Sequence, residues 1–170
     1  PCAMILGDNI FYGSGLETEL QKATQNADEG IATIFGYQVK DPERFGIMEL
    51  DKNNNVLSVE EKPSVPKSDY AITGLYFYPK GVCEKAKQIK PSKRGELEIT
   101  TLNDMYLKEH KLKAELLGGG FNWFDTGTFD SQLDASITIR TMQNNQDKVI
   151  ACLEQIAYKK GWINKIIWRI

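Results

Sequence analysis

The hydrophobic positions of the chain fall into short runs that predict strands alternating with amphipathic helices. Continuous or alternating apolar runs predict strands at 3–6, 30–39, 46–51, 56–63 and 71–79, and two more around a glycine turn within 113–127. Apolar residues spaced three or four apart predict helices at 14–25, 81–89, 128–146 and 152–162, and a longer one within 91–110. This alternation indicates one α/β domain with a mixed sheet and with helices gathered toward the C-terminus.

Two of the predicted strands carry more specific signals. The strands at 46–51 and 56–63 are joined by an asparagine-rich turn, which predicts a β-hairpin. In the strand at 71–79, the period-two pleat places on one face Ile72, Gly74, Tyr76 and Tyr78. Because a glycine in the middle of a strand weakens the sheet, Gly74 predicts the close approach of a ligand or of another backbone segment.

Composition excludes several classes of function. The 170 residues carry a formal net charge of -2, which weighs against a nucleic-acid partner. No apolar run approaches the ~20 residues of a membrane span. The three cysteines are scattered and odd in number, which favours a reducing, cytoplasmic setting. The single histidine, His110, lies in a polar run near a predicted helix end, which disfavours catalytic triads and histidine-bound metals.

The continuous apolar run at 3–6 predicts a buried strand. Two carboxylates follow short apolar segments, Asp8 after this strand and Asp125 within NWFDTG. Ligands of open α/β sheets bind at the carboxyl ends of the strands, so these side chains converge if both strands lie parallel in one sheet. Converging carboxylates repel unless a cation lies between them, and Mg²⁺ accepts one or two carboxylates together with waters and phosphate oxygens. The alternative is that each aspartate is a turn residue or a helix cap.

A second group of charges ends the strand at 56–63, where Glu60, Glu61 and Lys62 directly precede a proline. A lysine there can meet a phosphate as a point charge, and a neighbouring glutamate can accept hydrogen bonds from sugar hydroxyls. Arg94 precedes a predicted helix, where forked hydrogen bonds and the helix N-terminus both suit a phosphate. By spacing alone, all of these residues are equally well explained as solvated surface charges.

Six long motifs in a fixed order resemble the glucose-1-phosphate thymidylyltransferase family of sugar nucleotidyltransferases. They run from Met4 to Ile163 and read LGDNIFYGSGL, GYQVKDPERFGIMELD, SVEEKPSVPKSDYAITGLYFYP, KPSKRGELEIT, FNWFDTGTFDSQLDAS and ACLEQIAYKKGWI. The resemblance implies a Rossmann-like nucleotidyltransferase fold, with a nucleotide-binding sheet followed by a sugar-binding part. It implies that dTTP and glucose 1-phosphate give dTDP-glucose and pyrophosphate with Mg²⁺, a step of nucleotide-sugar biosynthesis.

The same resemblance implies roles for individual charged residues. Asp8 and Asp125 match the family's two metal-binding aspartates, and Lys62 and Arg94 match the cations that hold the sugar phosphate. The implied mechanism is an in-line attack of the sugar phosphate on the α-phosphorus of dTTP. The protein contributes positioning and charge neutralisation, so no covalent intermediate with the protein is needed.

The remaining matches concern the sugar. Asn9 and Gly46 match sugar contacts, and Glu61 matches the carboxylate that binds sugar hydroxyls. Ile72 stands where the family usually has a valine that contacts the sugar through its backbone, and Tyr76 matches a residue that lines the same pocket.

The chain also departs from the family pattern. The family begins with a strand and a glycine-rich loop, G-G-x-G-T-R-L, that cradles the triphosphate, and nothing in the chain matches them. We therefore expect 1–170 to be a single partial domain without those N-terminal strands and silent in catalysis by itself. We also expect either that it self-associates through the exposed edge of the strand at 3–6, or that upstream residues of the protein lie outside the given sequence. The turn Gly118–Gly120 replaces the family's G-R-G, which puts feedback inhibition in doubt, and the ending NKIIWRI also departs from the pattern.

Two further functions stay open at this point. The chain can be a sugar-phosphate-binding module without turnover, or an assembly subunit whose C-terminal helices form the interface of a homo-oligomer. Within the enzyme class, a relative that uses UTP or CTP is the alternative, because the family reads the base mainly through the unmatched segment.

Overall fold

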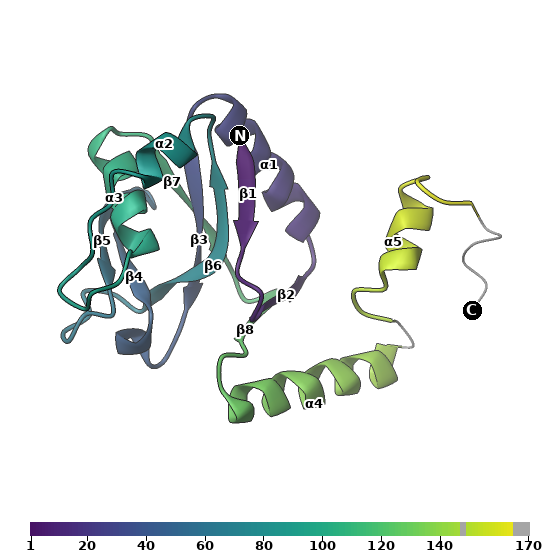
Figure 1. Cartoon of the computed structure of the whole chain (residues 1–170). Helices are drawn as coiled ribbons and strands as arrows, with labels where there is room; N and C mark the ends of the chain where they lie inside the picture. The colour runs from purple at the N-terminus through teal and green to yellow at the C-terminus, as the bar shows by residue number, and fades with distance from the viewer. Residues whose placement is uncertain (147–148, 165–170) are drawn as a thin grey trace. The chain divides into compact units, whose positions relative to one another are not determined.

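The computed structural model describes residues 1–146 and 149–164 and divides the chain into two compact units, Pro1–Asp125 and Thr126–Ile170. The elements of the first unit appear in Figure 1 and are β1 Cys2–Ile5, β2 Asn9–Gly13, α1 Leu16–Asp28, β3 Ala32–Gln38, the 3₁₀ helix η1 Pro42–Arg44, β4 Gly46–Leu50, β5 Val56–Glu61, β6 Tyr70–Tyr78, α2 Val82–Ala86, α3 Ile99–Lys108, β7 Leu112–Leu117 and β8 Phe121–Asp125. The second unit contains α4 Phe129–Gln146 and α5 Leu153–Lys159.

A six-stranded mixed sheet forms the centre of the first unit, which confirms the expected α/β class. Its main order is β5-β4-β6-β3-β7, and β1 pairs with the C-terminal half of β6, on the edge that also receives β4. β3 and β7 run parallel, whereas β6 is antiparallel to its neighbours β1, β3 and β4. The predicted hairpin is also present: β4 and β5 are antiparallel, and the Asp51 carboxylate accepts the backbone N–H groups of Asn53 and Asn55 in the turn.

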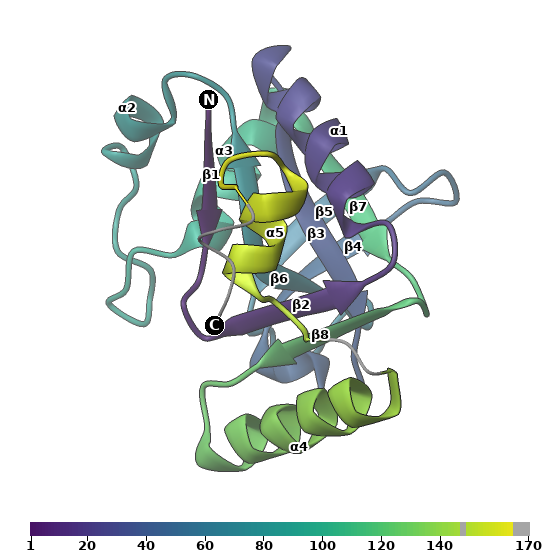
Figure 2. The ribbon, with the colours of Figure 1, turned by 90° about the vertical axis from the view of Figure 1, so that its right-hand side faces the viewer.

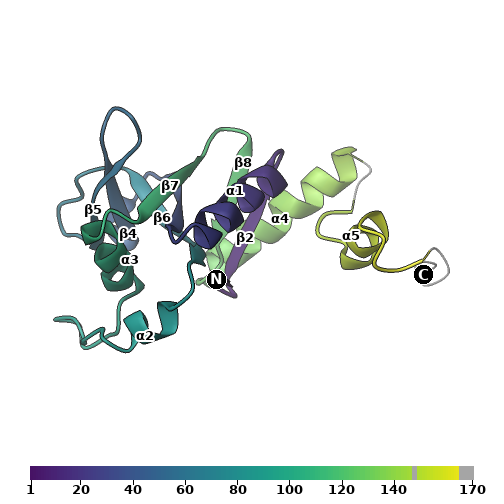
Figure 3. The same ribbon diagram turned by 90° about the horizontal axis from the view of Figure 1, so that it is seen from above.

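The period-two pattern of β6 gives the sheet two apolar faces, one covered by α3 together with α2 and the other by α1. The face that holds Ile72, Tyr76 and Tyr78 packs against Leu102 and Tyr106 of α3. The opposite face packs against α1 through a cluster that includes Ala23, Ala27, Phe35, Leu75 and Phe77. Figures 1 and 3 show the sheet between α1 and α3.

The strand at 3–6 differs from the expectation. It is not buried: Ile5 is 58% exposed and Leu6 is 43% exposed. The reason is that, within the part of the chain that the structure describes, β1 pairs with β6 along one edge only.

The segment after Asp8 also differs, because it forms the strand β2, which the pattern did not predict. β2 pairs with β8 in a separate antiparallel ribbon, and Figure 2 shows this ribbon crossing the large sheet at the end where β1 finishes. The two strands predicted around the glycine turn therefore belong to different sheets, β7 to the large sheet and β8 to the ribbon.

The second unit consists of the two predicted C-terminal helices. Thr128 caps α4, because its Oγ1 accepts the Ser131 N–H while the Ser131 Oγ accepts the Thr128 N–H. α5 ends just before Gly161, whose φ of +72° suits glycine. In the described residues, no helix is long and apolar enough to cross a membrane. The ending NKIIWRI, apart from Asn164, lies outside the described residues.

Candidate active site

Side chains from six segments of the first unit surround a cavity of about 210 Å³, here called the Asp8 cavity. Its lining includes eight of the nine site residues predicted from the sequence, which are Asp8, Asn9, Gly46, Glu61, Lys62, Ile72, Tyr76 and Asp125. The ninth, Arg94, lines a neighbouring cavity of about 400 Å³, here called the Arg94 cavity. The two cavities share Glu61 and Thr100, so the predicted residues form one continuous region.

The amide of Asn9 joins the ribbon to the large sheet. Its Oδ1 accepts hydrogen bonds from the Gly74 N–H at 3.0 Å and from the Trp123 Nε1–H at 2.6 Å, while its Nδ2 donates to Asp8 Oδ1 at 2.9 Å. Because both partners of Oδ1 are obligate donors, this network fixes the orientation of the amide. A Cβ at residue 74 would lie 2.7 Å from the Asn9 side chain. The close approach that Gly74 predicts is therefore made by a side chain.

The ribbon also brings Asp8 and Asp125 to the same cavity. Asn9, the neighbour of Asp8, lies directly opposite Asp125 in the antiparallel register of β2 and β8. The condition that both strands lie parallel in one sheet is not met, because β1 and β8 belong to different sheets. The antiparallel ribbon nevertheless produces the predicted convergence on one cavity.

This donor set fits Mg²⁺. Two carboxylates beside a cavity that admits waters and phosphate oxygens match the preference of that ion for hard oxygen ligands. Within 1–146 and 149–164, no group of three or more His, Cys, Asp or Glu side chains is arranged to hold a metal. An ion held by Asp8 and Asp125 therefore needs further oxygens from water or substrate.

Glu61 presents a fixed carboxylate at the junction of the two cavities. Its Oε2 accepts a hydrogen bond from the Thr100 hydroxyl, and its partner across the β4–β5 hairpin is Gly46. A Cβ at residue 46 would lie 3.2 Å from both Glu61 Oε2 and Thr100 Oγ1, so a side chain there would crowd the pair. Burial raises the pKa of the Tyr76 phenol well above its ordinary value, and the nearby Glu61 carboxylate raises it further. An anionic acceptor beside a neutral phenol suits a ligand rich in hydroxyl groups.

Lys62 has a strained backbone at the end of β5. Its φ is +42°, in the left-handed region that favours glycine, and its N–H donates to the Phe45 carbonyl at 3.0 Å. Such conformations persist only where the surrounding structure determines them, and they concentrate at functional sites. Here the strained residue is the lysine for which the sequence predicts a phosphate contact.

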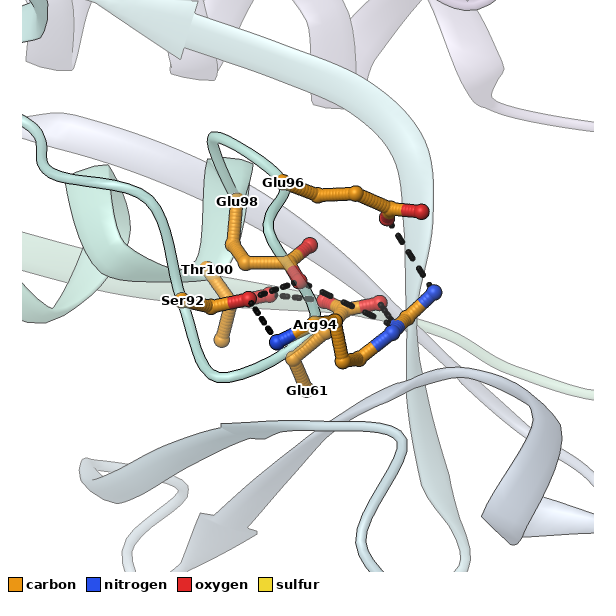
Figure 4. Close-up of polar contacts among 6 residues, drawn as sticks. All are labelled: Glu61, Ser92, Arg94, Glu96, Glu98 and Thr100. Atoms are coloured by element: carbon orange, nitrogen blue, oxygen red, sulfur yellow. Dashed lines mark hydrogen bonds and ion pairs between the residues drawn. The ribbon is translucent and has the colours of Figure 1, made fainter.

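Arg94 lies on a tight loop before α3, and Figure 4 shows its guanidinium among carboxylates. Nη2 lies 3.1 Å from Glu96 Oε2, and Nη1 lies 3.8 Å from both Glu61 Oε1 and Glu98 Oε1. The Ser92 hydroxyl holds the loop, because it accepts the Arg94 N–H at 3.1 Å and donates to Glu98 Oε1 at 2.9 Å. Arg94 therefore faces Glu61, at the boundary of the two cavities.

Seven residues that line the Asp8 cavity were not among the nine predicted ones. Three of the seven carry polar side-chain atoms: Arg44, Thr100 and Trp123. The ring centroid of Trp123 lies 5.3 Å from that of Phe45. The hydrogen bond of Trp123 to Asn9 has no local sequence signal. By sequence position alone, Thr100 is an ordinary residue in the first turn of a helix. Arg44 is by the same measure an exposed cation in a turn.

Comparisons with known proteins identify relatives of the chain. A family model described as nucleotidyl transferase matches residues 1–142. The chain is 54% identical to a glucose-1-phosphate thymidylyltransferase of Neisseria gonorrhoeae over 162 residues, which are 95% of this chain and 56% of the relative. It is 47% identical to the enzyme of that name from Mycobacterium tuberculosis, over 95% of this chain and 55% of the relative. The chain thus spans about half the length of the curated relatives it matches.

Solved structures show the same fold. A crystal structure from Bacillus anthracis, assigned as a glucose-1-phosphate thymidylyltransferase, superposes with a TM-score of 0.69 and 39% identity, over 80% of this chain and 53% of that one. A UDP-glucose pyrophosphorylase superposes with a TM-score of 0.70 over 82% of this chain and 56% of that one. At 18% identity, the second match shows the fold alone.

Proposed function

The chain belongs to the nucleotidyl transferase family, and on that premise we propose that it supplies the sugar-phosphate and metal site of a glucose-1-phosphate thymidylyltransferase. The reaction transfers a thymidylyl group from dTTP to glucose 1-phosphate and gives dTDP-glucose and pyrophosphate. The observation that carries the proposal is the Asp8 cavity, where a strained lysine, a fixed carboxylate and two aspartates line one space.

In this proposal the sugar lies against β4, β5 and β6. The Glu61 carboxylate accepts hydrogen bonds from sugar hydroxyls, and Thr100 holds that carboxylate in place. Gly46 and Ile72 line the cavity wall, and the absence of a side chain at residue 46 lets a ligand approach Glu61 closely. Sugar recognition thus uses an acceptor oriented before the ligand arrives, which lowers the entropic cost of binding.

The phosphate of the sugar lies between the two cations. Lys62 and Arg94 neutralise its charge and orient one oxygen toward the α-phosphorus of dTTP. That oxygen forms a bond to the α-phosphorus, the bond from this phosphorus to the bridging oxygen of the β-phosphate breaks, and pyrophosphate leaves with the electron pair. These residues act by positioning and charge neutralisation, since the nucleophile is the substrate itself.

Asp8 and Asp125 hold Mg²⁺ in this proposal. When bound, the ion neutralises the negative charge that accumulates on the phosphate oxygens. Asn9 contributes indirectly, because its Nδ2 hydrogen bond fixes one oxygen of Asp8.

The test is a calorimetric titration of the 170-residue chain with glucose 1-phosphate, with glucose 6-phosphate as the competing isomer. We expect the 1-phosphate to bind at least tenfold more tightly, because only that isomer places sugar and phosphate as Glu61 and Arg94 require. Arg94→Ala removes a charge-assisted hydrogen bond, a loss of ~1.5–3 kcal/mol, and weakens binding about tenfold or more. Lys87→Ala is the control, because Lys87 pairs with Glu84 on α2, away from both cavities.

Equal affinity for the two isomers, or an unchanged affinity in Arg94→Ala, contradicts the proposal. Because the family reads the base mainly through the segment that this chain does not match, a relative that uses another base is distinguished by comparing turnover of dTTP, UTP and CTP when the chain is combined with the remainder of such an enzyme. A chain that binds the sugar phosphate but contributes to no turnover, even when combined with the remainder of such an enzyme, is a binding module.

A further inference from the structure

Three carboxylates surround the guanidinium of Arg94, the cation that we propose binds the phosphate of the sugar. Arg94 carries one positive charge, and Glu61, Glu96 and Glu98 all lie within 3.8 Å of its guanidinium (Figure 4). Of these three contacts, the one to Glu96, at 3.1 Å, is a hydrogen bond, whereas those to Glu61 and Glu98 are ion pairs at 3.8 Å. A phosphate that takes a forked pair of N–H groups from this guanidinium competes with these carboxylates for the one positive charge.

We propose that Glu98 is a positioning residue that keeps Arg94 at the cavity, whereas Glu96 is the partner that Arg94 releases when a sugar phosphate binds. This inference rests on the proposed function, because it takes Arg94 as a ligand of the phosphate. It adds two residues to the site, with opposite effects on affinity.

Burial separates the two glutamates. The Glu98 side chain is 10% exposed, whereas the Glu96 side chain is 60% exposed and the Arg94 side chain is 40% exposed. Removing the cation from a buried carboxylate leaves an uncompensated charge, which is strongly unfavourable. An exposed ion pair contributes little, because water replaces the lost partner. The Glu96 contact is therefore the one that a phosphate displaces at least cost.

The neighbours of Glu98 also favour a fixed position. Its Oε1 accepts the Ser92 hydroxyl at 2.9 Å, and the same hydroxyl oxygen accepts the Arg94 backbone N–H at 3.1 Å. Glu98 is the N-cap residue of the ten-residue helix α3, where the helix dipole favours a negative charge. Ser92 and Glu98 thus hold both the backbone and the side chain of Arg94.

The loop does not depend on the Glu96 side chain. The Ser92 N–H donates to the Glu96 carbonyl at 2.8 Å, and the Gly95 N–H donates to the Ser92 carbonyl at 2.9 Å. Gly95 adopts a φ of +79°, which this turn requires. Because main-chain hydrogen bonds close the turn, Glu96→Gln should leave the fold intact and change only the competition for Arg94.

The experiment compares two substitutions that remove the same charge from the same guanidinium. Calorimetric titration with glucose 1-phosphate at low salt should show tighter binding in Glu96→Gln, by about two- to fivefold, the value of one exposed ion pair. Glu98→Gln should weaken binding by about threefold or more, because Arg94 then loses its buried anchor. Ser92→Ala keeps every charge and should weaken binding in the same direction as Glu98→Gln, so it replaces Glu98→Gln if that variant does not fold.

Glu84→Gln is the matched control, since Glu84 is an exposed glutamate paired with Lys87 at 2.8 Å on α2. It lowers the net negative charge equally and should not change the affinity. A second titration with inorganic phosphate should show the same gain in Glu96→Gln, whereas neutral glucose should show none. A general electrostatic effect would instead appear in Glu84→Gln as well, and a loss of structure would affect neutral glucose too.

The outcomes separate this inference from the proposed function. If Arg94→Ala leaves glucose 1-phosphate affinity unchanged, the proposed function fails. If Arg94→Ala weakens binding but Glu96→Gln fails to tighten it beyond Glu84→Gln, only the release of Glu96 is wrong. Unchanged or tighter binding in both Ser92→Ala and a folded Glu98→Gln overturns the positioning role.

Discussion

Lys62 combines a strained backbone with a charged side chain at the Asp8 cavity, and substitutions can separate the two. A left-handed conformation costs a non-glycine residue ~1–2 kcal/mol, and the extra unfolded-state entropy of glycine offsets ~0.5–1 kcal/mol of this. We therefore expect Lys62→Gly to be more stable than Lys62→Ala by ~0.5–1 kcal/mol in urea unfolding. Both variants should lose glucose 1-phosphate affinity alike. A Lys62→Ala variant as stable as Lys62→Gly would show that the backbone at this position is relaxed.

Gly74 provides a second test at the scale of one residue. A Cβ at this position would meet the Asn9 side chain at 2.7 Å, so Gly74→Ala forces Asn9 away from the centre of β6. We expect a loss of ~1–3 kcal/mol in the free energy of unfolding, the usual cost of overpacking. Gly7→Ala is the matched control, because a Cβ there meets nothing within 4 Å. Equal losses in the two variants would mean that Asn9 adjusts without cost.

The sequence predicted the candidate site residues better than it predicted the residues that form hydrogen bonds with them. Motif resemblance and charge at segment ends pointed to Asp8, Glu61 and Lys62, and the fold brings them to one cavity. The bonds that orient them join residues far apart in the chain, as Trp123 and Asn9 show. No local pattern of residue types reports such a pairing, because it arises only when the ribbon meets the large sheet.

At the scale of elements, the β2–β8 ribbon brings together the two aspartates of the proposed metal site. Because Asn9 lies opposite Asp125, both aspartates lie at the same end of one ribbon. We expect Asp8→Asn and Asp125→Asn each to weaken Mn²⁺ binding, measured by electron paramagnetic resonance, by about tenfold or more, since each removes an anionic ligand. The double variant should be far less than additive if one ion is shared.

Asp28→Asn is the control for this measurement, because Asp28 is an exposed residue at the end of α1. Unchanged Mn²⁺ binding in either Asp8→Asn or Asp125→Asn removes that residue from the metal site.

Element prediction failed where a strand depends on its partner. Asn9–Gly13 is short and lies between turn-forming residues, so its sequence predicts a loop. It becomes a strand in the structure because it pairs with β8. The continuous apolar run at 3–6 predicts a buried strand, but burial also depends on whether neighbouring strands lie along both of its edges. The hairpin of β4 and β5 was predictable, because its turn residues and both strands are contiguous.

At the scale of the whole molecule, one edge of β1 is a candidate for pairing. Within the described residues, β1 pairs only with β6, and Ile5 is 58% exposed. Unpaired apolar edges favour association between chains. We expect sedimentation velocity to show concentration-dependent self-association that Ile5→Lys reduces. Val65→Lys, at a loop position that is 80% exposed, adds the same charge and should have no effect; equal behaviour of the two variants would exclude this edge.

The overall class was predictable, but the arrangement of strands was not. Alternating strand and helix patterns predicted an α/β chain with a mixed sheet, and the structure has one. The strand order requires long-range choices, such as the insertion of β6 between β4 and β3, that periodicity does not encode. The division at Asp125 also has no compositional marker, because no linker-like stretch separates β8 from α4.

The central claim is that glucose 1-phosphate binds in the Asp8 cavity, and amide chemical-shift mapping of the ¹⁵N-labelled chain tests it most directly. On saturation with glucose 1-phosphate, we expect the largest shifts at Gly46, Glu61, Lys62 and Ile72, which line that cavity. A separate cavity of about 430 Å³, lined by Asn53–Asn55 and Leu112–Leu116, should remain unperturbed and serves as the internal control. Shifts centred on that separate cavity, or no shifts at saturating ligand, would contradict the account.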